Sequence, residues 1–290
     1  HLKYGGIYLE KFMKKIVNSI IRKKNIPCLI KSGILHSLQK KGRPINKSGN
    51  YRGITIIKLI GKVLDIIISQ HQQSCIPNTH NLQFSFTKNK SPNHATMLLN
   101  EIIIEAKETK KSLYILNMDI QKAFDMVPHD HLLRKLYVEG MVGKWWLLKK
   151  SAYKDMSTRV MWKGKLGEPI KILQGTRQGG IGNTQDFKIE MKDSSENVHN
   201  HQAGCKFNEI DVSIITCADD VVIASNKLDD MLELIGLMNN MVNKERMTIH
   251  PQKSTVSILG EKKEVAKIKE EQPFEICLRI FLHDVSSFLR

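Results

Sequence analysis

Two adjacent aspartates, Asp219 and Asp220, interrupt a run of β-prone residues, and this feature constrains the fold of the chain most. Apolar residues dominate positions 212–215 before the pair and 221–224 after it. Two apolar runs joined by a few polar residues predict a β-hairpin, here with both carboxylates near its tip. Neighbouring carboxylates repel each other, so the pair either points into water or has a cation beside it. Mg²⁺ suits the pair, since it usually takes one or two protein carboxylates together with substrate phosphates.

The charge of the chain restricts its partners. The 290 residues include 45 Lys and Arg against 29 Asp and Glu, which gives a formal net charge of +16 and a pI near 9.6. Such an excess of cations favours a polyanionic partner, and nucleic acid is the commonest one. The alternative is a generic basic protein.

Cysteine usage and hydropathy indicate the compartment. The five Cys are scattered and form no C-x-x-C pair, which argues for a reducing compartment and against disulfides or a zinc site. No apolar run approaches the roughly 18 residues of a membrane span, and the first residues lead into a charged helix rather than a signal peptide. We therefore expect an intracellular protein, in the nucleus or the cytoplasm, that is not secreted and contacts no membrane.

Hydrophobic periodicity predicts helices and strands that mix without strict alternation, which is typical of an α+β fold. Helices are expected over residues 7–25, 58–71, 92–106, 128–136, 143–153 and 227–243. Strands are expected over 83–86 and 113–119, as a hairpin within 158–173, and as strand, turn and strand over 247–259. Residues 183–204 are polar, and we expect them to be irregular and poorly packed.

The sequence alone does not decide the role of two basic segments. The lysine-rich helix expected over 7–25 is amphipathic and suits a membrane surface or nucleic acid, but we favour packing on its own domain. The loop over 39–53 is cationic and punctuated by Gly, Pro, Asn and Ser, so we expect it to be exposed. It either contacts a phosphate backbone or is a solvated linker.

A third aspartate, Asp119, ends the strand expected over 113–119, whose apolar residues face both ways as in a central strand. If this strand and the hairpin are neighbours in one sheet, Asp119, Asp219 and Asp220 converge. Three carboxylates at one edge can hold two Mg²⁺ ions about 4 Å apart, an arrangement that suits in-line phosphoryl transfer.

Six ordered segments between about residues 40 and 260 resemble the motifs of the reverse transcriptase of non-LTR (LINE-type) retrotransposons. Residues 50–55 resemble N-Y-R-P-I-S/T, residues from 83 onward resemble Q-x-G-F-R-x-G-R-S-T, and residues 117–130 resemble L-D-x-x-K-A-F-D-x-V-x-H. Residues 175–180 resemble G-V-R-Q-G-D/G, residues 217–220 stand where the family has Y-A-D-D, and residues 247–254 resemble L/M-x-I-x-P-x-K-S/T. The order and spacing of the six segments make the resemblance specific.

The resemblance implies a right-hand polymerase fold with fingers and palm subdomains, an antiparallel palm sheet and a largely missing thumb. The expected division is an N-terminal helical extension over 1–38, a reverse transcriptase domain over 39–260 (fingers 39–112, mainly palm 113–260) and a truncated thumb remnant over 261–290. The implied function is RNA-directed DNA polymerase activity. It consists of two-metal nucleotidyl transfer from deoxynucleoside triphosphates to the 3′-hydroxyl of a DNA primer on an RNA template.

Position by position, the resemblance also implies the site residues. Asp119, Asp219 and Asp220 would bind two Mg²⁺ ions, with Mn²⁺ as an alternative, and Lys253 would complete the catalytic set beside the triphosphate. The alternative for Lys253 is a solvated lysine in a turn. Phe124 would lie under the sugar of the incoming nucleotide and exclude a 2′-hydroxyl, unless it is a core aromatic. The remaining substrate-binding residues would be Arg177, Gln178, Gly179, Arg52, Lys88 and Lys90.

Several residues depart from the family pattern. Cys217 replaces the tyrosine of Y-A-D-D, Thr87 replaces an arginine of the fingers, and Ser85 and Asn89 replace glycines. Residues 182–187 also differ from the S-P-x-L-F-N helix start of the family. The alternative function is a catalytically inactive, nucleic-acid-binding remnant of such a polymerase, which would bind through its basic charge alone.

Overall fold

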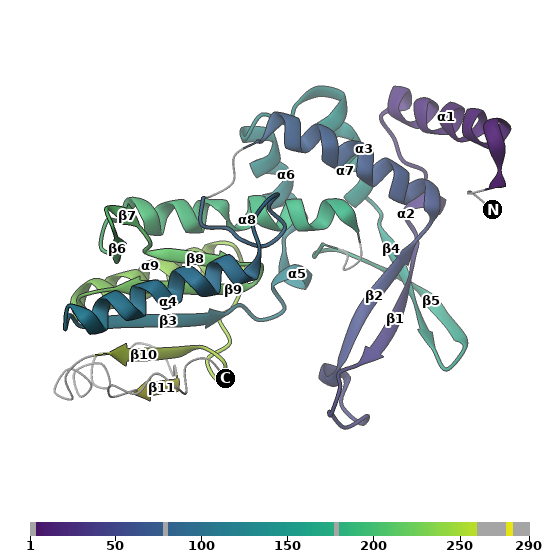
Figure 1. Ribbon diagram of the computed structural model, residues 1–290. Helices are drawn as coiled ribbons and strands as arrows, with labels where there is room; N and C mark the ends of the chain where they lie inside the picture. The colour runs from purple at the N-terminus through teal and green to yellow at the C-terminus, as the bar shows by residue number, and fades with distance from the viewer. Residues whose placement is uncertain (1–3, 78–80, 177–179, 260–276, 281–290) are drawn as a thin grey trace. The chain divides into compact units, whose positions relative to one another are not determined.

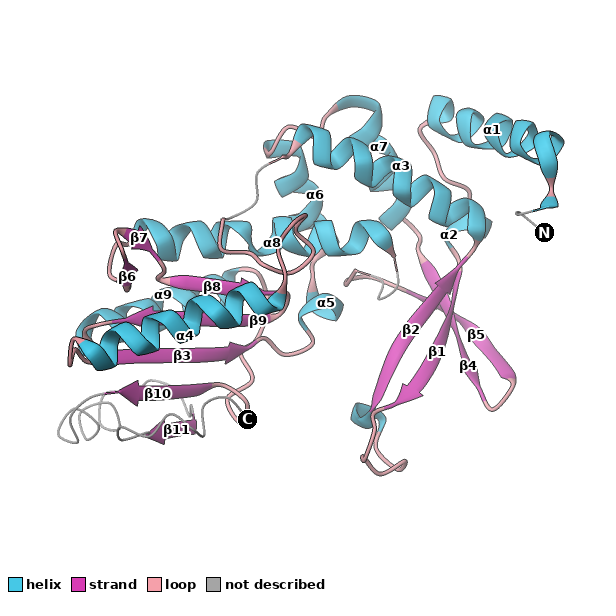
Figure 2. Ribbon diagram, in the orientation of Figure 1, coloured by secondary structure: helices cyan, strands magenta, loops and turns pink. Residues whose placement is uncertain are grey.

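The computed structural model describes residues 4–77, 81–176, 180–259 and 277–280. The chain divides into two compact units that each draw on two stretches of sequence: a first unit of residues 1–77 and 124–190, and a second unit of residues 78–123 and 191–290 (Figure 1). Both units combine helices with a mostly antiparallel sheet (Figure 2), which confirms the predicted α+β class. The domain boundaries expected at residues 38, 112 and 260 stay predictions. Of the helices that the structure describes, none has the length and apolar character to cross a membrane.

The first unit combines helices with a four-stranded sheet. Its elements are α1 (Gly6–Lys23), α2 (Cys28–Lys31), β1 (Gly33–Gln39), the short helix η2 (Ser48–Asn50), β2 (Tyr51–Ile57), α3 (Leu59–Cys75), α5 (Ala123–Met126, at the boundary), α6 (His129–Val138), α7 (Gly143–Tyr153), β4 (Ser157–Trp162) and β5 (Lys165–Lys171). The strand order is β2-β1-β4-β5, with β1 and β4 parallel. β4 and β5 form the predicted hairpin, and its loop residues Lys163 and Gly164 have positive φ angles (47° and 78°), as a type I′ turn requires.

The second unit is organised around a five-stranded sheet. Its elements are α4 (Pro92–Glu108), β3 (Leu113–Asp119), β6 (Lys206–Phe207), β7 (Ile210–Asp211), β8 (Ile214–Cys217), β9 (Asp220–Ser225), α9 (Leu228–Lys244), β10 (Thr255–Leu259) and β11 (Cys277–Ile280). The strand order is β11-β10-β3-β9-β8, in which β10 and β11 are parallel and the other neighbours antiparallel. β6 and β7 form a separate hairpin.

Strand β3 lies in the middle of this sheet and is covered on both faces, as its sequence predicts. Its residues 113–116 are at most 2% exposed. Leu113 and Ile115 belong to one apolar cluster with Ile102 and Ile103 of α4. Helix α9 packs against β9, behind the sheet in the view of Figure 1. Because burial on both faces holds β3 in place, its last residue, Asp119, stands on a rigid element.

Helix α8 (Ile181–Asn200) is the main departure from the sequence prediction. The expectation that residues 183–204 are irregular is wrong, because most of them belong to this helix. Residues 186–191 are buried in succession, although they include Asp186, Lys188 and Glu190. The helix is buried by tertiary packing rather than along one apolar stripe, so its sequence shows no helical period that could be recognised.

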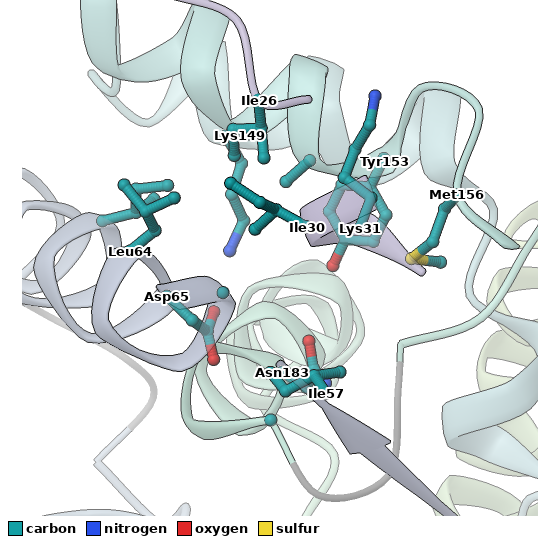
Figure 3. A pocket seen from close by; sticks show the side chains of 14 residues that line it. Ile26, Ile30, Lys31, Ile57, Leu64, Asp65, Lys149, Tyr153, Met156 and Asn183 are labelled. Carbon is teal, nitrogen blue, oxygen red and sulfur yellow. The ribbon is translucent and has the colours of Figure 1, made fainter. Parts of the chain in front are cut away.

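A buried ion pair joins α7 to α8 in the first unit. Lys149 Nζ lies 2.7 Å from Asp186 Oδ1, and the two side chains are 4% and 0% exposed. The hydroxyl of Tyr153 donates to Asp186 Oδ2 at 2.5 Å. Lys149 and Tyr153 also line a cavity of about 80 Å³, with Asp65 of α3 across from Lys149 (Figure 3). Asp186 is thus a fully buried charge that depends on these two partners.

Removal of one partner from this ion pair is expected to destabilise the protein more than removal of both. Asp186→Ala leaves the Lys149 ammonium buried without its carboxylate, so the free energy of unfolding should fall by about 3–5 kcal/mol. The double variant Lys149→Met/Asp186→Leu should lie within about 1 kcal/mol of the wild type or above it, because apolar replacement of a buried pair is often neutral or stabilising. Urea denaturation compares the variants, and equal losses in both would contradict the prediction.

Candidate active site at the carboxylate end of the second unit's sheet

The predicted hairpin is present and carries its two aspartates at adjacent positions. β8 and β9 pair as far as Cys217↔Asp220, and Ala218 and Asp219 form the loop between them. Ala218 has a φ of 60°, the sign that a type II′ turn requires at its first loop position. Asp219 is therefore the second residue of the loop, whereas Asp220 is the first residue of β9.

The register of the neighbouring strand brings the third aspartate to the same place. β3 and β9 are antiparallel, and Asp119 is the direct partner of Asp220. Side chains of directly opposite residues lie on one face of the sheet, with Cβ atoms about 4.5–5.5 Å apart. Asp119, Asp219 and Asp220 thus gather at one end of the sheet.

The three carboxylates influence one another electrostatically. The pKa of Asp220 is raised above its ordinary value, first by partial burial of the carboxyl group and then by the negative charges of Asp219 and Asp119, while the ammonium of Lys253 opposes the rise. A carboxylate whose charge is disfavoured by its neighbours is stabilised by a nearby cation. Carboxylate oxygens are also the donors that Mg²⁺ prefers, so this donor set fits a divalent metal ion.

The segment after α9 holds Asp119 through backbone hydrogen bonds and an ion pair. The N–H of Asp119 donates to the Oγ of the buried Ser254 at 3.1 Å, and its carbonyl accepts the N–H of His250 at 2.8 Å. Lys253 Nζ lies 3.2 and 3.1 Å from the two carboxylate oxygens of Asp119, with its side chain 60% exposed. Lys253 was predicted from the sequence, whereas Ser254 and His250 were not, although the final Ser/Thr of the motif over 247–254 was an available signal for Ser254.

Two of the predicted substrate-binding lysines, Lys88 and Lys90, also belong to the second unit. Lys88 is exposed. The ammonium of the half-buried Lys90 donates to the carbonyl of Asn81 and lies 5.6 Å from the centroid of the Phe84 ring. The structure therefore gives Lys90 a local structural contact and leaves Lys88 accessible to a ligand.

The other predicted residues belong to the first unit or lie outside the described residues. Arg52 in β2 is exposed. Phe124 is half-buried and stacks on the fully buried Phe187 of α8, with ring centroids 4.3 Å apart. Arg177, Gln178 and Gly179 lie outside the described part of the chain. The buried Thr176 just before them donates its N–H to the carbonyl of Phe124 at 2.7 Å, so the start of the glycine-rich loop adjoins Phe124.

Comparison with known proteins identifies relatives of the chain. A family model described as “Reverse transcriptase (RNA-dependent DNA polymerase)” matches residues 38–275. The RNA-directed DNA polymerase from mobile element jockey of Drosophila melanogaster is 24% identical over 234 residues, which are 78% of this chain and 25% of that protein. The Transposon TX1 uncharacterized 149 kDa protein of Xenopus laevis is 22% identical over 220 residues, or 75% of this chain and 17% of that protein. The chain thus spans a quarter or less of the length of these two relatives.

Similar solved structures include telomerases of Candida. The apo telomerase of Candida tropicalis, truncated from its C-terminal domain, aligns with a TM-score of 0.55 at 13% identity, over 85% of this chain and 55% of that chain. The telomerase of Candida tropicalis in complex with a TWJ fragment of telomeric RNA aligns with a TM-score of 0.55 at 14% identity, over 84% of this chain and 44% of that chain. At this identity the likeness concerns the fold alone, and it agrees with the predicted polymerase architecture.

Replacement of Asp220 by asparagine is expected to stabilise the metal-free protein at neutral pH. The pKa of this carboxyl group is raised in the folded state, so the folded protein favours its protonated form. The resulting contribution to the free energy of unfolding is fully present below the ordinary pKa and is lost as the pH rises through the folded-state pKa. Asp220→Asn removes this loss. Its melting temperature in EDTA should therefore exceed that of the wild type at about pH 7, with no gain at about pH 3, below the ordinary pKa of an aspartate. An equal gain at both pH values would refute the electrostatic cause.

Proposed function

The chain belongs to the reverse transcriptase family, and from this premise we propose that it is the RNA-directed DNA polymerase module of a retrotransposon protein. The resemblance to non-LTR retrotransposon reverse transcriptases is confirmed by the family match and by the mobile-element relatives. The proposed reaction adds a deoxynucleotide to the 3′-hydroxyl of a DNA primer on an RNA template. The proposal is carried by the strand register that makes Asp119 and Asp220 direct partners, with Asp219 in the adjoining loop.

We propose Asp119, Asp219 and Asp220 as the ligands of two Mg²⁺ ions, with Mn²⁺ as the alternative ion. Hard carboxylate oxygens support this assignment, as do the partial burial and the neighbouring negative charges that together raise the pKa of Asp220. When bound, such ions make a hydroxyl more nucleophilic and stabilise charge on a transferred phosphoryl group. The chain holds the three carboxylates on and beside two hydrogen-bonded strands, so little reorganisation is needed during the reaction.

Lys253 is proposed to contact the triphosphate and to protonate the leaving pyrophosphate. Its ammonium pairs with Asp119, and its side chain is 60% exposed. A lysine carries three donors on a four-carbon stem, so it can pass from a carboxylate to a phosphate oxygen without backbone movement. Its backbone N–H meanwhile donates to the carbonyl of His250 at 3.1 Å, which keeps the stem beside Asp119.

Phe124 is proposed to exclude nucleotides that carry a 2′-hydroxyl. Stacking on the buried Phe187 anchors one face of its ring, and half-burial leaves the rest accessible.

Arg177, Gln178 and Gly179 are proposed to line the nucleotide pocket. The template and its phosphates are the proposed partners of Arg52, Lys88 and Lys90.

RNA template and DNA primer are the proposed macromolecular partners. The net charge of +16 supports a polyanionic ligand, and binding of this kind weakens steeply with salt because condensed counterions are released. A non-catalytic remnant would share this charge, so a test of the proposal must separate chemistry from binding.

The direct test is Mg²⁺-dependent extension of a labelled DNA primer on an RNA template. Asp219→Ala is expected to lower extension by about 10³-fold or more, because a lost metal ligand removes several kcal/mol of transition-state stabilisation and each 1.36 kcal/mol is tenfold. Binding of primer–template should change by less than about threefold and should stay strongly salt-dependent.

Asp229→Ala is the matched control, because it removes an exposed aspartate of the same unit, in the first turn of α9. It should leave extension unchanged. Extension that survives in Asp219→Ala would overturn the proposal. A wild-type protein that binds in a salt-sensitive way without extending the primer would instead be a non-catalytic remnant.

Phe124→Val is expected to relax the choice of sugar. The preference for deoxynucleotides over ribonucleotides, measured as the ratio of kcat/KM values, should fall by about 10- to 100-fold, the range that one added group in a tight pocket is worth. Phe187→Leu is the control, since it disturbs the buried stacking partner and should lower stability without changing the ratio as much. An unchanged ratio in Phe124→Val, with reduced stability, would make Phe124 a core aromatic only.

A further inference from the structure

A short segment before α4 runs alongside the hairpin that carries the aspartates. The N–H of Thr216 donates to the carbonyl of Leu82, and the N–H of Phe84 donates to the carbonyl of Thr216, both at 2.9 Å. Gln83 and Thr216 thereby form a parallel bridge beside β8. The strand expected over 83–86 is limited to this bridge, which places the side chain of Gln83 close to the tip of the hairpin.

The side chain of Gln83 ends at the hairpin loop. Gln83 is 4% exposed, and its Oε1 accepts the backbone N–H of Ser85 at 3.1 Å and that of Ala218 at 3.4 Å. Both neighbours are donors, so the oxygen of the amide, rather than its nitrogen, must face them. In a two-residue hairpin loop, the turn hydrogen bond joins the flanking residues and leaves the first loop N–H without an acceptor. Gln83 supplies that acceptor, one residue before Asp219.

The hydrogen bond from Ala218 to Gln83 matters because Ala218 has an unusual backbone conformation. Its φ of 60° lies in the left-handed region that residues other than glycine, asparagine and aspartate rarely adopt. An alanine keeps such a conformation only where its surroundings hold it. A second contact from the same segment, Ser85 Oγ at 2.9 Å from Cys217 Sγ, reaches the residue before Ala218. The segment therefore holds the hairpin at two successive residues just before Asp219.

We infer, on the premise of the proposed function, that Gln83 is a positioning residue for the metal-binding carboxylates. By accepting the N–H of Ala218, it keeps the loop in the conformation from which Asp219 projects beside Asp119 and Asp220. Gln83 acts through the backbone and not through direct contact with an ion or substrate. Mg²⁺ demands near-ideal octahedral geometry, so a small displacement of one carboxylate weakens its binding.

Gln83→Met tests the inference, because it removes the acceptor while roughly keeping the length and volume of the side chain. Its affinity for Mn²⁺, measured by titration with detection of free Mn²⁺ by electron paramagnetic resonance, should fall about tenfold, at the lower end of the effect of residues that orient metal ligands. Gln83→Glu keeps acceptor oxygens at the same place, so it should bind Mn²⁺ more tightly than Gln83→Met. Gln72→Met is the matched control: Gln72 in α3 is 2% exposed, and its replacement should leave Mn²⁺ affinity unchanged.

One further variant separates failure of this inference from failure of the proposed function. Asp219→Asn should weaken Mn²⁺ binding more than Gln83→Met does. If Asp219→Asn binds Mn²⁺ as the wild type does, the proposed metal site itself is wrong. If Asp219→Asn loses binding while Gln83→Met keeps the wild-type affinity, the metal site stands and Gln83 has no positioning role.

Hydrogen exchange in the unaltered protein tests the same contact even if Gln83→Met fails to fold. Lys163 is the first loop residue of the β4–β5 hairpin, as Ala218 is of the β8–β9 hairpin. The amide of Ala218 should exchange at least about tenfold more slowly than that of Lys163, after correction for intrinsic rates, because a buried carbonyl oxygen accepts it. Equal protection factors at the two amides would overturn the inference.

Discussion

The antiparallel pairing of β3 with β9 is the interaction on which the rest of the candidate site depends. The ladder runs from Tyr114↔Ser225 to Asp119↔Asp220, and most of its length is buried. A slip of one residue would move every side chain of one strand to the opposite face of the sheet. Because the apolar side chains on both faces of β3 are closely packed, such a slip would disrupt this packing and move Asp119 away from Asp220. Hydrophobic burial therefore determines where two of the three carboxylates lie.

Around this ladder, the backbone and the charged groups have different environments. The backbone of Asp119 is held by the buried Ser254, and the loop before Asp219 is held by the buried Gln83. The charged groups are partly accessible, since Asp220 is an exposed residue whose carboxyl group is only partly buried, and the side chain of Lys253 is 60% exposed. A fixed backbone with reachable charges combines preorganisation with access for an ion and its substrate.

Polar replacements in this chain are accommodated where the polar group finds a partner. Ser85 and Cys217 both depart from the family pattern, and their Oγ and Sγ atoms lie 2.9 Å apart beside the hairpin loop. In α8, the buried Asp186 is likewise satisfied by Lys149 and Tyr153. Buried polar groups require such partners, and a sequence pattern does not reveal them. For this reason the buried helix that includes most of the polar residues 183–204 was not recognised.

By itself, the sequence determined the family, the aspartate-bearing hairpin and the strand that ends at Asp119. Apolar alternation and the order of motifs are local properties, which can be recognised without knowledge of the fold. Only the tertiary structure decided that Asp119 faces Asp220, that Lys253 pairs with Asp119, and that Gln83 reaches the hairpin loop. These contacts join segments as far as 135 residues apart. Their register depends on how the apolar faces of the sheet are packed, and no local pattern of residues specifies that packing.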